Sequence, residues 1–213
     1  MLSIQALIFD LDGTLYYNPD LQKKQLEVAI SILQVHLDCS YNHAKKMFEE
    51  TRSSLKKQFG YEPSNTYSIT KIGIPLEKYL KESEKRYDAG RFLNKDKQLI
   101  EILNKFKQQF KLSLLTNNNK YQTYRMLNSL GIQDVWDIIL TLSDTKIIKP
   151  DKRLYQLISK KLKVHPEQCI VIGDRKEIDL SPAKQIGMHT ILVSGVFDVY
   201  KLRDKINKII HNK

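Results

Sequence analysis

The chain has 213 residues, 41% of them hydrophobic and 28% charged, a composition typical of a folded globular protein and unlike that of disordered, collagen-like or coiled-coil chains. No apolar run approaches the ~18 residues of a membrane span, and the first residues lack the basic region of a signal peptide, so we expect a cytoplasmic protein. The net charge of +11 is carried mainly by scattered lysines, 28 of 35 cationic residues, which favours a small anionic partner over nucleic acid.

Five short apolar runs rich in β-branched residues predict strands. They lie at 4–9, 112–115, 138–142, 170–172 and 190–193. Segments with helical periodicity lie between the later strands, at 99–110, 121–130 and 154–158. Because strands alternate with helices, we expect an α/β protein with a Rossmann-like three-layer core, in which helices cover both faces of a parallel sheet.

The segment between the first and second strands carries no strand signal and is predicted to be helical. Asp20 and Ser40 can cap two helices, and a further helix is expected after Pro75. The stretch 60–75, with two glycines and two prolines, is predicted to be the loop between these helices. We therefore expect a small all-helical second domain, residues 17–94, inserted into a core made of residues 1–16 and 95–213.

The first predicted strand ends in the motif DLDGT, which contains Asp10 and Asp12. Side chains alternate along an extended chain, so both carboxylates point to the same side beyond the carboxyl end of the strand, where α/β sheets bind ligands. One carboxylate can attack as a nucleophile while the other transfers protons. The alternative is an Asp-Gly turn with a capping aspartate, which the rarity of the whole motif disfavours.

Two further segments carry groups that can bind a phosphoryl group. Thr116 and Asn117 precede a helix expected to start near Asn119, so a hydroxyl, an amide and helix N-terminal N–H groups can converge there, although a plain helix cap is the alternative. Lys149, followed by a proline, has an ammonium group that can neutralise phosphoryl and carboxylate charge. Lys146 is the competing candidate.

Asp174 follows the apolar run 169–172 and predicts a metal site. Its carboxylate would be repelled by that of Asp10 unless a cation lay between them. Mg²⁺ prefers oxygen ligands and binds through one or two carboxylates together with a substrate phosphate, so Mg²⁺ is the expected cofactor. Asp179 is either a helix cap or an acid behind the metal ligands.

In this order, the motifs DLDGT, LLTN, IKPD and IGD resemble those of the haloacid dehalogenase (HAD) superfamily, and the resemblance covers the whole chain. The proline after Lys149 is part of it and favours Lys149 over Lys146, whereas Arg175 stands where the family often has serine. The inserted helical segment is similar to the cap of many HAD phosphatases. The resemblance thus implies a Mg²⁺-dependent phosphatase that acts on a small phosphorylated metabolite, such as a nucleoside monophosphate or a sugar phosphate, through an aspartyl phosphate.

The resemblance also implies a role for each residue of the motifs. The expected roles are Asp10 as nucleophile, Asp12 as acid and then base, Thr116, Asn117 and Lys149 as phosphate ligands, Asp10, Asp174 and the Asp12 backbone carbonyl as Mg²⁺ ligands, and Asp179 behind them. Tyr61, Tyr67 and Lys71 are candidate substrate contacts in the cap, although core packing is the alternative for the tyrosines. Residues 16–19 and 88–94 are candidate hinges.

Three alternatives stay open at this point. A phosphomutase or phosphotransferase would use every one of these residues and pass the phosphoryl group to a substrate hydroxyl. A dehalogenase would share the nucleophile but would need neither the metal nor the second acid. A non-catalytic phosphate-binding or nucleic-acid-binding module would need no nucleophile at all. The five histidines and the two cysteines form no catalytic or metal-binding pattern, and we expect a monomer or weak homodimer.

Overall fold

The computed structural model describes residues 3–211 and divides into two compact units. One unit contains the chain up to Asn18 together with the chain from Leu93 onward, and the other contains Pro19–Phe92. The first unit is an α/β core and the second is wholly helical, so the predicted fold class is confirmed.

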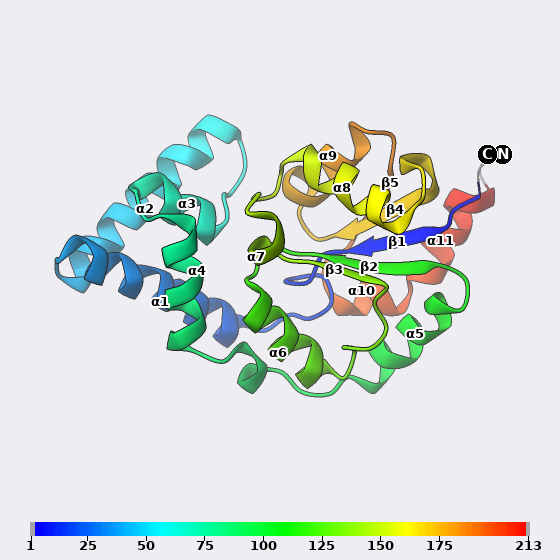
Figure 1. The fold of residues 1–213 in the computed structure, drawn as a ribbon, viewed down its shortest axis with the longest axis horizontal. Helices are drawn as coiled ribbons and strands as arrows, with labels where there is room; N and C mark the ends of the chain where they lie inside the picture. Colours follow the sequence, from blue (N-terminus) through cyan, green and yellow to red (C-terminus); the bar gives the residue numbers. More distant parts are fainter. Residues whose placement is uncertain (1–2, 212–213) are drawn as a thin grey trace. The chain divides into compact units, whose positions relative to one another are not determined.

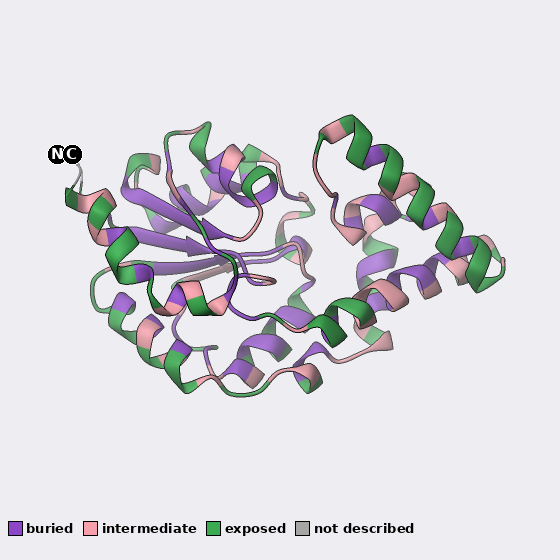
Figure 2. Ribbon diagram, turned by 180° about the vertical axis from the view of Figure 1, so that it is seen from behind, coloured by how far each residue is buried: buried purple, intermediate pink, exposed green. Residues whose placement is uncertain are grey.

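The core is built on five parallel strands in the order β3-β2-β1-β4-β5 (Figure 1). The strands are β1 (Ala6–Phe9), β2 (Lys111–Leu115), β3 (Ile138–Leu140), β4 (Cys169–Gly173) and β5 (His189–Leu192). All five coincide with the predicted runs, although the first and the third are shorter than expected. Figure 2 shows that the central strands are buried, as continuous apolar runs predict for a parallel sheet covered on both faces.

Helices cover both faces of this sheet. Figure 1 shows α8 (Lys152–Leu162) and α9 (Ser181–Lys184) on one face, and α5 (Lys97–Lys107), α6 (Lys120–Leu130), α10 (Val196–Tyr200) and α11 (Leu202–His211) on the other. Gly131, as predicted, ends α6 with φ 77°, a left-handed conformation that glycine adopts without steric cost. The sequence prediction missed α10, α11 and the short α7 (Leu142–Thr145), which begins where the third strand was expected to end.

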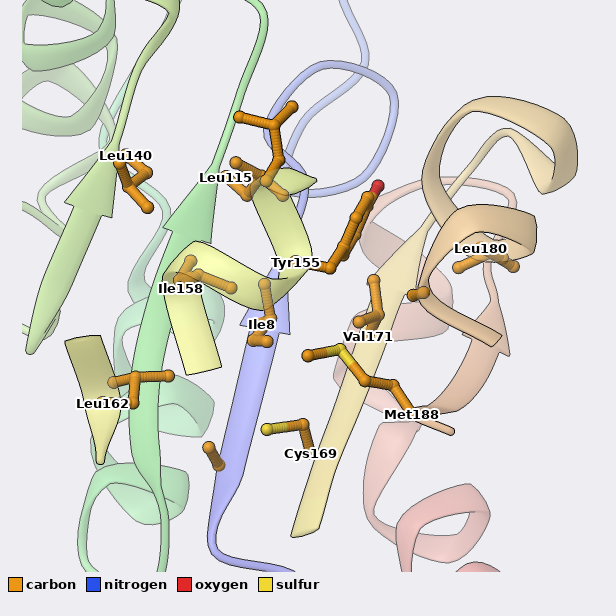
Figure 3. Close-up of a cluster of buried hydrophobic side chains, with 13 residues drawn as sticks. Ile8, Leu115, Leu140, Tyr155, Ile158, Leu162, Cys169, Val171, Leu180 and Met188 are labelled. Atoms are coloured by element: carbon orange, nitrogen blue, oxygen red, sulfur yellow. The ribbon is translucent and has the colours of Figure 1, made fainter. Parts of the chain in front are cut away.

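The layer between α8 and the sheet is a cluster of buried apolar side chains (Figure 3). Ile158 of α8 packs there with Ile8 of β1 and Val171 of β4. Tyr155 lies in the same layer, and its hydroxyl points toward the carboxyl ends of the strands, where it donates a hydrogen bond to the Ile178 carbonyl at 3.2 Å. This packing fixes the carboxyl edge of the sheet on which the site is built.

The helical unit contains α1 (Pro19–Leu37), α2 (Tyr41–Phe59), α3 (Asn65–Ile72), α4 (Leu76–Arg86) and a 3₁₀ turn, η1 (Ala89–Phe92). Ser40 caps α2 as predicted, because its hydroxyl accepts from the His43 N–H at 3.2 Å. Asp20 does not cap α1. That helix already begins at Pro19, so the Asp20 carboxylate lies inside the first turn.

The predicted loop over residues 60–75 is wrong, because it contains α3. The Ser64 hydroxyl caps that helix by accepting from the Tyr67 N–H at 3.2 Å, and Gly73 ends it with φ 117°. Glycine and proline therefore mark the two ends of a short helix here rather than a continuous loop. Between residues 3 and 211, no helix has the length and apolar character needed to cross a membrane.

Candidate active site

The strand register brings three of the predicted residues to one edge of the sheet. Phe9 at the end of β1 lies beside Leu114 of β2 and Ile172 of β4. The residues that follow these strands, Asp10, Thr116 and Asp174, therefore emerge next to one another at the carboxyl edge. The strand that carries Asp10 lies between the other two in the sheet, so Asp10 is the middle member.

Lys149 is the buried cation of this edge. Its side chain is 2% exposed, and its Nζ donates to Asp10 Oδ1 at 2.5 Å, to Asp179 Oδ1 at 2.7 Å and to the Leu115 carbonyl at 3.1 Å. All three protons of the ammonium group thus have an acceptor. Lys146 is exposed at the end of α7, so the structure brings Lys149 rather than Lys146 to Asp10.

The charges at this edge shift the pKa values of the paired groups. Burial raises the pKa of Asp10 to about 7; Lys149 opposes the shift, and the carboxylates of Asp179, Asp12 and Asp174 add to it. Burial alone would lower the pKa of Lys149, but the carboxylates of Asp10 and Asp179 raise it well above its usual value. Lys149 is therefore a permanent cation in a site that holds more negative than positive charge.

The surroundings of Asp174 fit a divalent cation. Carboxylate oxygens of Asp10, Asp174 and Asp179 lie within 4.8 Å of one another, and Asp174 Oδ1 is buried with no hydrogen-bond partner among the described residues. Burial raises the pKa of Asp174 to about 6, and the Asp179 carboxylate adds to the shift. A Cβ on Gly13 would lie 2.4 Å from Asp174 Oδ2, so only glycine leaves room for this carboxylate. A buried carboxylate oxygen without a donor favours a nearby cation, and oxygen ligands suit Mg²⁺.

Asp179 lies in a π-helical turn (Lys176–Leu180) and not at the start of an α-helix as predicted. Its side chain is 1% exposed, with Oδ1 paired to Lys149 and Oδ2 accepting from the Arg175 N–H at 3.1 Å. Both oxygens therefore serve to hold the loop and the lysine. Burial would lower the pKa of Arg175, but Asp179, Asp10 and Asp174 raise it, so a second cation faces the acidic cluster.

Thr116 and Asn117 differ in what their side chains contact. Thr116 is 3% exposed, and its Oγ1 accepts from the Asn118 N–H at 3.1 Å. The Asn117 side chain turns to the backbone of Lys149, where its Oδ1 accepts from the Lys149 N–H at 2.8 Å and its amide lies 3.5 Å from the Lys149 carbonyl. Asn117 therefore holds the lysine segment with its side chain.

The Asp12 carboxylate lies apart from the three clustered acids and has its own donors. The Tyr16 hydroxyl donates to Asp12 Oδ1 at 2.5 Å, and the Asn118 amide donates to Asp12 Oδ2 at 2.5 Å. Sequence reasoning missed both donors: Tyr16 was expected in a hinge, whereas it is 6% exposed and belongs to the core unit. The run Asn117-Asn118-Asn119 after the strand was the available signal for Asn118.

Comparisons with a family model, with related sequences and with solved structures all point to the same family. The family model described as haloacid dehalogenase-like hydrolase matches residues 7–193. The chain is 24% identical over 196 residues to the glyceraldehyde 3-phosphate phosphatase of Methanopyrus kandleri, covering 89% of this chain and 84% of that protein. It is 24% identical to the ribulose-1,5-bisphosphate 5-phosphatase of Halopiger xanaduensis, covering 88% and 83%. The crystal structure of a HAD phosphatase from Thermococcus onnurineus matches with a TM-score of 0.60 at 22% identity, covering 89% and 86%.

Proposed function

Because the chain belongs to the haloacid dehalogenase-like hydrolases, as its motifs predicted, we propose that it is a Mg²⁺-dependent phosphatase of a small sugar phosphate. The observation that carries the proposal is the arrangement around Asp10, a carboxylate beside a fixed ammonium group and within 4.8 Å of a carboxylate oxygen of Asp174, whose Oδ1 has no hydrogen-bond partner among the described residues. A nucleophile, a phosphate-binding cation and a metal ligand thus meet at one sheet edge. The phosphatases among its relatives support a sugar phosphate as substrate over a nucleoside monophosphate.

In the first step Asp10 attacks phosphorus and forms an aspartyl phosphate. Lys149 holds Asp10 Oδ1, whereas Asp10 Oδ2 has, among residues 3–211, only a 3.4 Å contact with the Thr14 hydroxyl, so we assign the attack to Oδ2. Lys149 and the Thr116 hydroxyl, together with the Asn117 N–H, balance the charge of the phosphoryl oxygens. Asp12 gives a proton to the leaving oxygen.

In the second step water hydrolyses the aspartyl phosphate. Asp12, now a carboxylate, takes a proton from that water, which releases inorganic phosphate and restores both acids. Asp10, Asp174 and the backbone carbonyl of Asp12 would hold Mg²⁺, with Asp179 behind them. The ion supplies positive charge that lowers the repulsion between the phosphate and the carboxylates.

The helical unit is assigned the role of a cap that selects the substrate. The chain enters this unit shortly after the DLDGT motif and returns before β2, and every residue given a chemical role lies outside it. Tyr61, Tyr67 and Lys71 are the candidate contacts. Tyr61 and Tyr67 both pack against Phe59, and Lys71 Nζ lies 5.3 Å from the Tyr67 ring centre, so an ordered aromatic and cationic group is available.

Phosphate release from a panel of phosphate esters tests the proposal. The panel contains glyceraldehyde 3-phosphate, ribulose 1,5-bisphosphate, a nucleoside monophosphate and 4-nitrophenyl phosphate, each with Mg²⁺ and with chelator. We expect release that needs Mg²⁺, is fastest with a sugar phosphate and is absent in Asp10→Asn. A phosphoryl group that appears on a second sugar rather than as free phosphate would instead identify a phosphotransferase. We also propose that the protein is cytoplasmic, which its two unpaired cysteines support. We expect it to be a monomer or a weak homodimer.

A further inference from the structure

The geometry points to Tyr16 and Asn118 as positioning residues that hold the Asp12 carboxyl group for proton transfer, an inference that rests on the proposed function. Each Asp12 oxygen has a donor of its own, the Tyr16 hydroxyl on Oδ1 and the Asn118 amide on Oδ2, both at 2.5 Å. Rotation of the carboxyl group about either side-chain torsion would break both contacts. Two donors on opposite oxygens therefore fix its direction as well as its place.

Tyr16 is itself fixed in the core unit. Its backbone carbonyl accepts from the Gly13 N–H at 3.1 Å, so the chain folds back on the DLDGT motif directly after it. Its hydroxyl also lies 3.4 Å from Met126 Sδ on α6. A hydroxyl has one proton to donate, and the contact with the Asp12 oxygen is shorter than the contact with the sulfur, so the proton is assigned to Asp12. The sulfur then packs against the hydroxyl and limits its movement.

Asn118 connects the acid to the phosphate-binding segment. Its backbone N–H donates to Thr116 Oγ1 at 3.1 Å, and its carbonyl accepts from the Leu142 N–H at 3.0 Å. The amide that holds Asp12 is therefore carried by the same short segment that carries Thr116. The proton donor and the phosphate-binding hydroxyl consequently keep a fixed separation, which is what a leaving oxygen bound between them requires.

A positioning role predicts a loss that depends on the leaving group. An alkoxide is a poor leaving group and needs the proton of Asp12, whereas 4-nitrophenolate leaves without much help. Loss of a positioning contact should therefore harm alkyl phosphates more than the nitrophenyl ester. A fold weakened in general would lower both rates by the same factor, so the ratio of kcat/KM values separates the two explanations.

The test uses the full chain with Mg²⁺ and compares Tyr16→Phe and Asn118→Ala with the unaltered protein. For each, kcat/KM is measured with 4-nitrophenyl phosphate and with glycerol 3-phosphate as the alkyl ester. Each variant should lose about tenfold or more on the alkyl ester and less than about threefold on the nitrophenyl ester, within the ~10²- to 10⁴-fold that a general acid contributes. Tyr200→Phe is the matched control, since it removes a tyrosine hydroxyl that donates to Asp96 elsewhere in the same unit. It should leave the ratio unchanged.

The outcomes separate this inference from the function on which it rests. An active chain whose Tyr16→Phe and Asn118→Ala variants lose equally on both esters would overturn the positioning role alone. A gain in activity on the alkyl ester would also overturn it, because the contacts would then restrain Asp12 away from the substrate. If the unaltered chain releases no phosphate from any ester, the proposed function fails and this inference with it.

Discussion

Replacing Lys149 with methionine tests the charge arrangement at the site most severely. Methionine keeps most of the volume of the stem and removes the charge, so the buried carboxylates of Asp10 and Asp179 lose the cation between them. A charged hydrogen bond contributes about 1.5–3 kcal/mol, and Lys149 makes two of them. Removing one partner of a buried ion pair costs about 3–5 kcal/mol. Both routes give a loss near 4 kcal/mol in the free energy of unfolding.

A loss of this size is readily measured, because about 4 kcal/mol lowers the melting temperature of a domain this large by roughly 8–16 °C. Trp136, the only tryptophan of the chain, lies edge-on to Phe9 with ring centres 5.9 Å apart, so its fluorescence follows the core unit next to Asp10. Thermal unfolding is measured by the fluorescence of Trp136 in the presence of chelator. Lys146→Met is the matched control, since that exposed lysine should contribute less than about 0.5 kcal/mol.

The pH dependence gives a second signature. Without Lys149, the pKa of Asp10 should rise further, and a carboxyl group whose pKa is raised by folding stabilises most below about pH 4 and loses that stabilisation as the pH increases. The unaltered chain, in which the pKa of Asp10 is about 7, loses this stabilisation equally up to about pH 7, so the difference between Lys149→Met and the unaltered chain should grow above about pH 7, where Asp10 ionises in the unaltered chain alone. A Lys149→Met variant as stable as Lys146→Met at neutral pH would refute the reasoning.

Three further predictions concern metal, chemistry and specificity. Folding raises the pKa of Asp10 to about 7 and of Asp174 to about 6, so the metal-free core should lose stability from about pH 4 to about pH 7. Mg²⁺ should therefore raise the melting temperature of the core more near pH 7.5 than near pH 5. Calorimetry that shows an equal increase in melting temperature at both pH values would contradict this. Asp12→Asn should turn over poorly yet still form a phosphoenzyme slowly with 4-nitrophenyl phosphate, because the nucleophile is intact, and rapid-quench labelling that detects none would count against the division of roles. Tyr67→Ala and Lys71→Ala should each lower kcat/KM more for the preferred sugar phosphate than for the aryl ester, by a factor that corresponds to ~1–3 kcal/mol of transition-state stabilisation. Equal losses on both esters would exclude these two side chains as the specificity element.

The sheet and its edge could be predicted because their signals are local. Each strand is a continuous apolar run, and Asp10, Thr116 and Asp174 directly follow such runs. Parallel strands end at the same edge, so no knowledge of packing was needed to bring these residues together. Lys149 is different. Its sequence context did not separate it from Lys146, and the choice depended on the proline that follows it.

The parts that could not be predicted depend on contacts between distant segments. The Asn117 side chain binds the backbone of Lys149, and the Asp12 carboxylate binds an amide 106 residues away, at Asn118. Local periodicity carries no information about such pairs. The short α3 was hidden for another reason, since its eight residues lie between a proline and a glycine, which also occur together in loops.

The most direct test of the central claim is the identity of the residue that carries the phosphoryl group during turnover. The chain is mixed with Mg²⁺ and a ³²P-labelled phosphate ester, quenched in acid within milliseconds and digested, and the labelled peptide is sequenced by mass spectrometry. We expect a hydroxylamine-sensitive label on Asp10, as an acyl phosphate gives, and no label in Asp10→Asn. A label on any other residue, or a label that persists in Asp10→Asn, would contradict it.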